Sequence, residues 1–121
     1  MQTLALLAAL ALAPADTSPN SRAWLVSQQI QVTPGSETAV AIVIRHDPGW
    51  HSYWINPGDS GQATSIKWNA PAGFSVERGF WNPPQRLVTP DGVTFGYEGD
   101  AVHVARLVVP ADAKPGSTIN L

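Results

Sequence analysis

Cysteine is absent from this chain of 121 residues. Its absence excludes a disulfide, a thiolate nucleophile and a cysteine-ligated metal site within these residues. Charge of one sign is also scarce, because seven Lys and Arg against nine Asp and Glu leave a formal net charge of −2. Such a balance indicates no nucleic-acid partner. The longest hydrophobic run, Leu4 to Ala13, is too short to span a bilayer as a helix, so we expect no direct membrane insertion of the mature protein.

The N-terminal segment has the pattern of an export signal. Ala-Pro-Ala at positions 13–15 follows the apolar run and fits the small residues before a signal-peptidase cut, with Asp16 as the new first residue. No Lys or Arg precedes the run, so the apolar end of a cytosolic protein is the alternative. Export is favoured because an exposed Leu/Ala run has no evident use in a folded domain. We expect residues 1–15 to be a signal peptide and residues 16–121 to be one exported domain.

Eleven prolines and ten glycines interrupt the rest of the sequence at short intervals. Between them, short runs alternate polar and apolar residues with the period of two that is typical of β-strands. This spacing predicts a single all-β domain, an antiparallel β-sandwich. We expect strands at Trp24–Val32, Ala39–Arg45, Trp50–Ile55, Ser65–Asn69, Phe74–Val76, Ala101–Val109 and Ser117–Leu121. Because the last strand runs to the end of the sequence, the domain is expected to be incomplete at its C-terminal end.

The same patterns predict which parts of the strands are buried or irregular. In the first strand, the even-numbered residues from Trp24 to Val32 are mostly apolar and are expected to face the core. In the Ala101–Val109 run the alternation changes at Arg106, which predicts a β-bulge near Ala105. Residues 78–94 contain two proline-rich turns and are expected to form a long irregular loop of the kind that often carries function.

The stretch from Gly49 to Gly61 concentrates aromatic, histidine and turn residues. Trp50 and Trp54 are expected in the core, since buried aromatics dominate the cores of small sandwiches. His51 and Tyr53 lie on the opposite face of the expected strand, where a binding surface and a half-exposed structural role are equally open.

The expected strand ends before Asn56, because Pro57 cannot donate a ladder hydrogen bond and the neighbouring glycines suit positive φ. Residues 56–61 are typical of a rigid turn in which the Asn56 and Asp59 side chains bond to the local backbone. A loop that grips a ligand is the alternative.

Four segments carry a family resemblance. Gly-Trp-His-Ser-Tyr-Trp-Ile-Asn-Pro-Gly-Asp-Ser-Gly occupies residues 49–61, Thr-Ser-Ile-Lys-Trp residues 64–68, Pro-Ala-Gly-Phe residues 71–74 and Phe-Gly-Tyr-Glu-Gly residues 95–99. Together they resemble the N-terminal periplasmic domain of DsbD- and ScsB-type thiol:disulfide interchange proteins, the disulphide bond corrector family. The resemblance extends over roughly residues 24–121.

The resemblance implies an immunoglobulin-like β-sandwich in the periplasm. Such a domain takes electrons from a membrane-embedded redox domain of the same parent protein and passes them to thioredoxin-like periplasmic proteins. The family's carrier is a cysteine pair on the last hairpin, and residues 116–121 resemble the strand that leads into it. Because thiol exchange needs a thiolate, we expect no catalytic residue and no cofactor within this chain, even if the parent protein is a thiol:disulfide reductase.

The chain is therefore expected to act through protein contact. In the family a loop shields the cysteines, and its counterpart by order is residues 78–94. This loop and the turn that begins at Tyr97 form the expected contact surface for thioredoxin-like partners. The candidate partner-binding residues are Phe80, Trp81, Tyr97, Glu98, His51, Tyr53, Asn56 and Asp59.

Two other functions stay open on residue chemistry. A carbohydrate-binding sandwich module is one, because aromatic faces stack on sugars and Trp, Tyr, Asn and Asp gather near residues 56–61. Copper handling by His46, His51 and His103 is a weaker one. The spacing of these histidines does not bring ligands together, so no metal site is expected.

Overall fold

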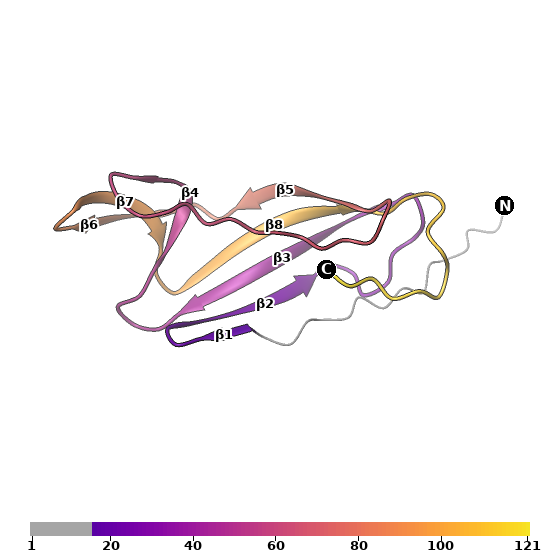
Figure 1. Cartoon of the computed structure of the whole chain (residues 1–121), viewed down its shortest axis with the longest axis horizontal. Coiled ribbons are helices and arrows are strands. Elements are labelled where there is room, and N and C mark those ends of the chain that lie inside the picture. Colours follow the sequence, from indigo (N-terminus) through magenta and orange to yellow (C-terminus); the bar gives the residue numbers. More distant parts are fainter. Residues whose placement is uncertain (1–15) are drawn as a thin grey trace.

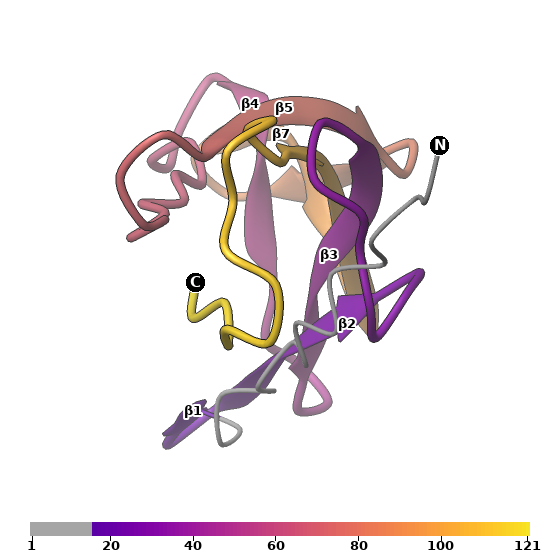
Figure 2. The ribbon, with the colours of Figure 1, turned by 90° about the vertical axis from the view of Figure 1, so that its right-hand side faces the viewer.

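The computed structural model describes residues 16–121, and the predicted signal peptide lies outside the described residues. Within this range the chain forms β-strands and no helix. The strands are β1 (Asp16–Ser18), β2 (Ser21–Ser27), β3 (Glu37–His46), β4 (Ser52–Gly58), β5 (Ser75–Trp81), β6 (Gln85–Thr89), β7 (Gly92–Tyr97) and β8 (Asp100–Val108). They build two antiparallel sheets, β1-β2-β3-β8-β5 and β4-β7-β6. The predicted antiparallel β-sandwich is confirmed, and Figure 2 shows β4 and β3 on opposite sides of its interior.

The long strands β3 and β8 form the middle of the larger sheet and lie side by side along the molecule (Figure 1). Their pairing is continuous from Glu37 opposite Val108 to Arg45 opposite Asp100. Along β8 every second residue, beginning at Ala101, is buried, so its alternation does not break at Arg106. The strand presents one continuous face to the core.

The predicted bulge near Ala105 lies instead in the neighbouring strand. Arg78 of β5 pairs with Ala105, and Trp81 pairs with His103. Two residues of β5 therefore stand opposite the single residue Val104, which is the arrangement of a β-bulge. Sequence alternation could not locate it, because the irregularity belongs to the partner strand.

The first predicted strand ends earlier than expected and buries its other face. β2 ends at Ser27, whose hydroxyl donates to the Gln29 carbonyl oxygen and accepts the Gln29 N–H, a local turn that competes with the sheet. Leu25 is buried, whereas Val26 is 42% exposed and Ile30 is 73% exposed. The expected burial of the even-numbered residues is therefore wrong for these two and correct for Val32.

The apolar core is formed by side chains of β2, β3 and β8 together with the C-terminal segment. Ile119 makes a single β-bridge there, in place of the strand expected at residues 117–121, and is almost fully buried. Trp68 and Phe74 pack against this core from the connection between β4 and β5. The buried cluster consists of Leu25, Val32, Val40, Ala105, Leu107, Val109 and Ile119.

Residues 78–94 do not form the long irregular loop that was expected. They contain the end of β5, all of β6 and the start of β7, with only residues 82–84 between β5 and β6. The β6–β7 hairpin pairs from Gln85 opposite Gly96 to Thr89 opposite Gly92 and extends from one end of the molecule (Figure 1). The proline and glycine residues of this region lie in the turns that connect these short strands.

Two further strand predictions differ from the structure. β4 continues through Pro57 to Gly58, but its pairing with β7 is interrupted between Tyr53 and Gly58, so the proline's missing N–H removes no ladder bond. Residues 65–69 alternate between exposed and half-buried side chains, yet they form no strand.

Trp50 precedes β4 and is 53% exposed, which contradicts its expected place in the core.

Candidate functional site

His103 lies at the centre of an aromatic cluster that joins the two sheets. Its side chain has no exposed surface. Its ring centroid is 3.9 Å from that of Trp81, with a tilt of 54°, and 5.4 Å from that of Tyr97 in an edge-to-face contact. The three rings come from β8, β5 and β7, and we call them the His103 cluster. Aromatic rings that pack in this geometry stabilise the folded state by more than the burial of their apolar surface alone would provide.

The bulge in β5 decides which aromatic side chain enters the cluster. It adds one residue opposite Val104, so Trp81 rather than Phe80 stands opposite His103. Phe80 is left 66% exposed on the surface. Asn82 then fastens the end of β5 to β8, because the Val102 N–H donates to Asn82 Oδ1 at 2.9 Å and the Asn82 N–H donates to the Val102 carbonyl at 3.2 Å.

The interior of the cluster is poor in polar partners. Burial, and to a smaller extent the nearby charge of His46, lowers the pKa of His103 to about 4, so the imidazole is neutral at pH 7. Within the described residues, neither ring nitrogen of His103 nor the Tyr97 hydroxyl has a hydrogen-bond partner. Burial also raises the pKa of Tyr97. Unpaired polar atoms at such depth are costly, and they need a structural or a functional reason.

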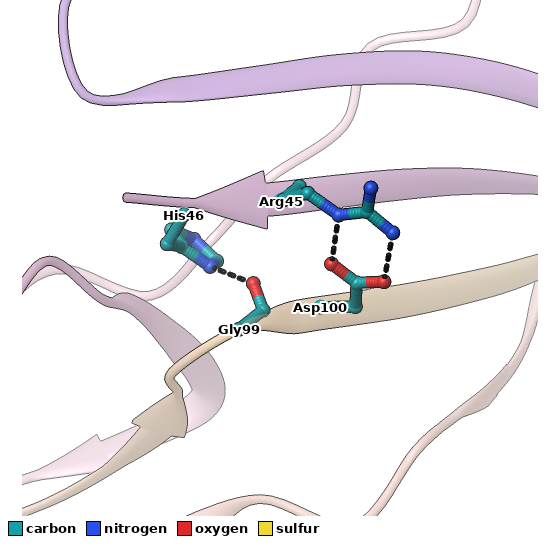
Figure 3. A network of polar contacts seen from close by, with 4 residues as sticks. All are labelled: Arg45, His46, Gly99 and Asp100. Atoms are coloured by element: carbon teal, nitrogen blue, oxygen red, sulfur yellow. Dashed lines mark hydrogen bonds and ion pairs between the residues drawn. The ribbon is translucent and has the colours of Figure 1, made fainter. Parts of the chain in front are cut away.

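The turn between β7 and β8 is held in place by β3 (Figure 3). Arg45 Nε and Nη2 donate to the two carboxylate oxygens of Asp100 at 2.8 and 2.9 Å, a bidentate pair that lowers the pKa of Asp100 and raises that of Arg45. His46 Nδ1 donates to the Gly99 carbonyl at 2.8 Å. The Glu98 N–H donates to Gln85 Oε1 of β6 at 2.7 Å. These contacts fix where the turn meets the His103 cluster.

The residues around β4 form separate contacts. The rings of His51 and Tyr53 meet edge to face at 5.1 Å, and both side chains are half-buried. The Tyr53 ring lies so close to Gly61 that a Cβ at this position would overlap it. Only glycine therefore allows the turn to close over the tyrosine, which leaves this ring covered on one side. The exposed indole nearby is that of Trp50.

Asp59 bonds to a distant strand and not to the local backbone, contrary to expectation. Its Oδ2 accepts the Val93 N–H at 2.9 Å, and its own N–H donates to the Val93 carbonyl at 3.0 Å. This pair ties the end of β4 to the β6–β7 hairpin. Asn56 is exposed in the interrupted part of β4.

Replacing Asp59 with alanine is expected to lower the free energy of unfolding by about 1 kcal/mol, because the Val93 N–H loses a charged acceptor. Urea unfolding monitored by tryptophan fluorescence measures the loss. Asp91→Ala is the matched control, since Asp91 is an exposed carboxylate of the same hairpin whose side chain makes no hydrogen bond in the described structure. Equal losses in both variants would contradict this role of Asp59.

The eight predicted site residues thus fall into three places. Trp81 and Tyr97 meet in the His103 cluster, with Phe80 and Glu98 exposed beside it. Tyr97 was expected on an exposed contact surface, but it is only 2% exposed and its ring packs against His103. His51 and Tyr53 meet each other, while Asn56 and Asp59 lie at the far end of β4.

His103 is the residue that sequence reasoning undervalued. It was considered only as a metal ligand, although it is the one titratable residue on the buried face of β8. The period-two pattern of that strand could have identified it.

The described residues contain no group of three or more His, Cys, Asp or Glu that could hold a metal ion. They also contain no helix long and apolar enough to cross a membrane.

Comparison with known proteins gives a family and a fold. Residues 21–121 match the family described as thiol:disulfide interchange protein DsbD, N-terminal. Among solved structures, the N-terminal periplasmic domain of ScsB from Proteus mirabilis aligns with a TM-score of 0.65 and 20% sequence identity. This alignment covers 87% of the present chain and 41% of that one, so the chain spans less than half of its length. At this identity the likeness shows the fold, an immunoglobulin-like sandwich. The search of curated proteins found no match.

Proposed function

The chain belongs to the family of N-terminal domains of the thiol:disulfide interchange protein DsbD, and from that premise we propose that it is a periplasmic docking domain for thioredoxin-like proteins. In this proposal residues 1–15 are removed on export and residues 16–121 form the domain. The domain has no cysteine, so the sulfur atoms that exchange electrons come from outside these residues. The chain supplies the binding surface and the scaffold on which that exchange takes place.

One observation carries the proposal: the bulge in β5 holds a large apolar side chain outward beside a rigid aromatic support. Phe80 is exposed, while its neighbour Trp81 is fixed against His103. An exposed aromatic on an ordered strand loses little conformational freedom when a partner covers it, which favours a role as a binding anchor. Glu98, exposed in the turn after β7, provides a polar rim.

In this proposal the domain has two kinds of partner. The first are periplasmic proteins with a thioredoxin fold, and the second is the membrane-embedded redox domain of the parent protein. Exchange between relay proteins must be transient, so the surface needs few strong anchors. A small apolar contact with a polar edge fits such an encounter.

Replacing Phe80 with alanine is expected to weaken binding to a purified thioredoxin-like periplasmic protein about tenfold, the loss of one anchor side chain. Isothermal titration calorimetry against the wild-type domain measures it. Val88→Ala is the matched control, because Val88 is 69% exposed on β6, away from the bulge. Trp81→Ala is expected to weaken binding as well, since it removes the support beneath the anchor.

Unchanged affinity in the Phe80 variant would show that the β5 bulge is not part of the contact surface. A similar loss in the Val88 variant would show that binding reports general surface hydrophobicity and not this site.

A further inference from the structure

The larger sheet has an apolar area on its outer face, the face that points away from the core. Along β3 and β8 every second residue points to the core, among them Val40 and Ala105, and the residues between them point outward. An antiparallel sheet with one face in solvent usually carries polar side chains on that face. In the middle of this sheet the outward side chains are instead apolar, namely Trp24, Val26, Ala41, Val43, Val102 and Val104.

Nothing in residues 16–121 forms a further layer over this area. The two sheets are the only layers of the described structure, and the smaller sheet lies on the core side of the larger one. Val26 is 42% exposed as a result. The sequence nevertheless has an apolar residue at every position from Ala39 to Ile44, which is typical of a strand that is covered on both faces. The outer cover of β3 must therefore come from outside these residues.

Charged side chains bound the apolar area at one end with an excess of positive charge. Arg45 of β3 and Asp100 of β8 form the bidentate ion pair shown in Figure 3. Arg22 of β2 stands opposite Arg45 in the sheet, is exposed, and makes no ion pair in the described structure. Two arginines and one aspartate give this end, the Arg45 end, a net charge of +1.

The other end of the area has an excess of negative charge. Arg106 of β8 pairs with Glu37 of β3 at 3.3 Å and with Glu77 of β5. One arginine and two glutamates give this end, the Arg106 end, a net charge of −1. All three side chains are about half exposed, so they remain available to a partner.

The charges are also arranged with opposite signs about one point of the sheet. In β3, Arg45 and Glu37 lie at equal distances in sequence on either side of Ala41. In β8, Asp100 and Arg106 lie at equal distances on either side of a residue that pairs next to Ala41. A two-fold axis that crosses both strands above Ala41 would place Arg45 opposite Glu37 of a second copy, and Asp100 opposite Arg106 of that copy. A two-fold interface needs this kind of self-complementary patch.

We propose that two copies of this chain associate face to face through the outer surface of the larger sheet, with the two-fold axis above Ala41. The apolar areas cover each other, and the Arg45 end of each copy meets the Arg106 end of the other. Val43 then lies opposite the small side chains of Ala39 and Ala41, so the side chains of the two sheets can interdigitate. The proposal rests on the pattern of this face and not on the proposed docking of thioredoxin-like proteins.

The size of the face fits a weak dimer. The paired residues from Glu37 to Arg45 make it about 30 Å long, and the strands β2, β3, β8 and β5 make it about 19 Å wide. Each copy thus contributes on the order of 600 Å², and the total of about 1,200 Å² is at the lower limit for specific interfaces. We therefore expect a dissociation constant on the order of 100 μM.

Sedimentation equilibrium of the protein recovered after export tests this association. At the expected affinity the protein is mostly dimeric at about 1 mM and mostly monomeric at about 10 μM. NMR spectra over the same range provide a second measurement on the unaltered protein. The backbone amides of Ala41, Val43 and Val102 are expected to shift with concentration, because they lie beneath the interface.

Charge-reversal variants test the orientation. Arg22→Glu makes both ends of the face negative, and Glu37→Lys makes both ends positive, so each variant alone is expected to dimerise about tenfold more weakly. An equimolar mixture of the two is expected to regain the wild-type affinity, because each end then meets its opposite. Lys67→Glu is the matched control, since it changes the net charge as Arg22→Glu does but lies in the connection between β4 and β5. It is expected to leave dimerisation unchanged.

A protein that stays monomeric at about 1 mM overturns the proposal. A dimer that Arg22→Glu and Lys67→Glu weaken equally also overturns it, as does a mixture of the two charge-reversal variants that binds no better than either alone. If the protein is monomeric and Ala41→Lys weakens its binding to a thioredoxin-like protein, the face belongs to that partner and the dimer is rejected.

Discussion

Lowering the pH from 7 to 4 is expected to remove on the order of 3 kcal/mol from the free energy of unfolding through His103 alone. The imidazole is fully buried between Trp81 and Tyr97 and has no hydrogen-bond partner among the described residues. Protonation would place a charge in this apolar surrounding, close to His46. The folded protein resists that protonation, and the unfolded chain does not.

The sign follows from the two pKa values. His103 titrates near its ordinary value of 6.5 in the unfolded chain and at about 4 in the folded protein. Between these values the unfolded state binds more protons, so stability rises with pH. The contribution is fully present above about 6.5 and is lost as the pH falls to about 4. Asp100 contributes little to the change in this window, because Arg45 holds its pKa below 3.8 and most of its contribution is lost below pH 4.

Urea unfolding at several pH values between 4 and 8 measures this dependence. In His103→Phe, which keeps an aromatic ring in the cluster, the dependence between pH 7 and 4 is expected to be nearly flat. His51→Gln, which removes a half-exposed imidazole, is expected to keep the wild-type slope. A wild-type stability that does not change between pH 7 and 4 would contradict the buried neutral state. An NMR titration of the His103 ring gives the folded pKa directly, whether or not the variant folds.

Gly96→Ala is expected to destabilise the protein by at least about 3 kcal/mol. Gly96 lies in β7 between β4 and β6, opposite Tyr53 on one side and Gln85 on the other. A Cβ at this position would overlap the Ser52 carbonyl oxygen and lie 3.3 Å from the Tyr53 Cα. Both are backbone atoms, so no side-chain rotation can relieve the contact. The β4–β7 pairing, which is already interrupted beyond Tyr53, has to move apart.

Gly116→Ala is the control for this substitution. Gly116 has a φ of 80°, and a Cβ there meets no atom within 4 Å. Its replacement is expected to cost about 1 kcal/mol from backbone strain alone. Thermal unfolding followed by circular dichroism compares the two variants. If Gly96→Ala were no less stable than Gly116→Ala, the close approach of β4 and β7 would not be a constraint on the fold.

Local sequence patterns were sufficient for the class of fold and for several turns. Hydrogen-bonded turns close at Ser36 and at Phe74, directly after two of the proline and glycine interruptions of the sequence. The central strand at residues 39–45 lies within β3, because a run of β-branched residues suits a strand with neighbours on both sides. The four short segments were specific enough to indicate the family, which the match over residues 21–121 confirms.

Pairing partners could not be predicted in the same way. The alternation at residues 65–69 was correct for exposure and wrong for secondary structure, since a strand also needs a neighbour to bond with. Residues 78–94 looked irregular because β6 and β7 are stabilised by each other and not by a strong local pattern. The bulge was assigned to β8 because its cause, an extra residue in β5, is invisible from β8 itself.

The sequence by itself determined that this is a cysteine-free antiparallel sandwich, since composition, turn residues and strand period are local properties. Four short segments, through their resemblance to known proteins, indicated the DsbD N-terminal family. Tertiary structure alone decided that Phe80 faces outward and that Trp81 and Tyr97 enclose His103. The physical reason is register. A single extra residue in β5 shifts its side chains relative to β8, and only the paired strands reveal which of them meet.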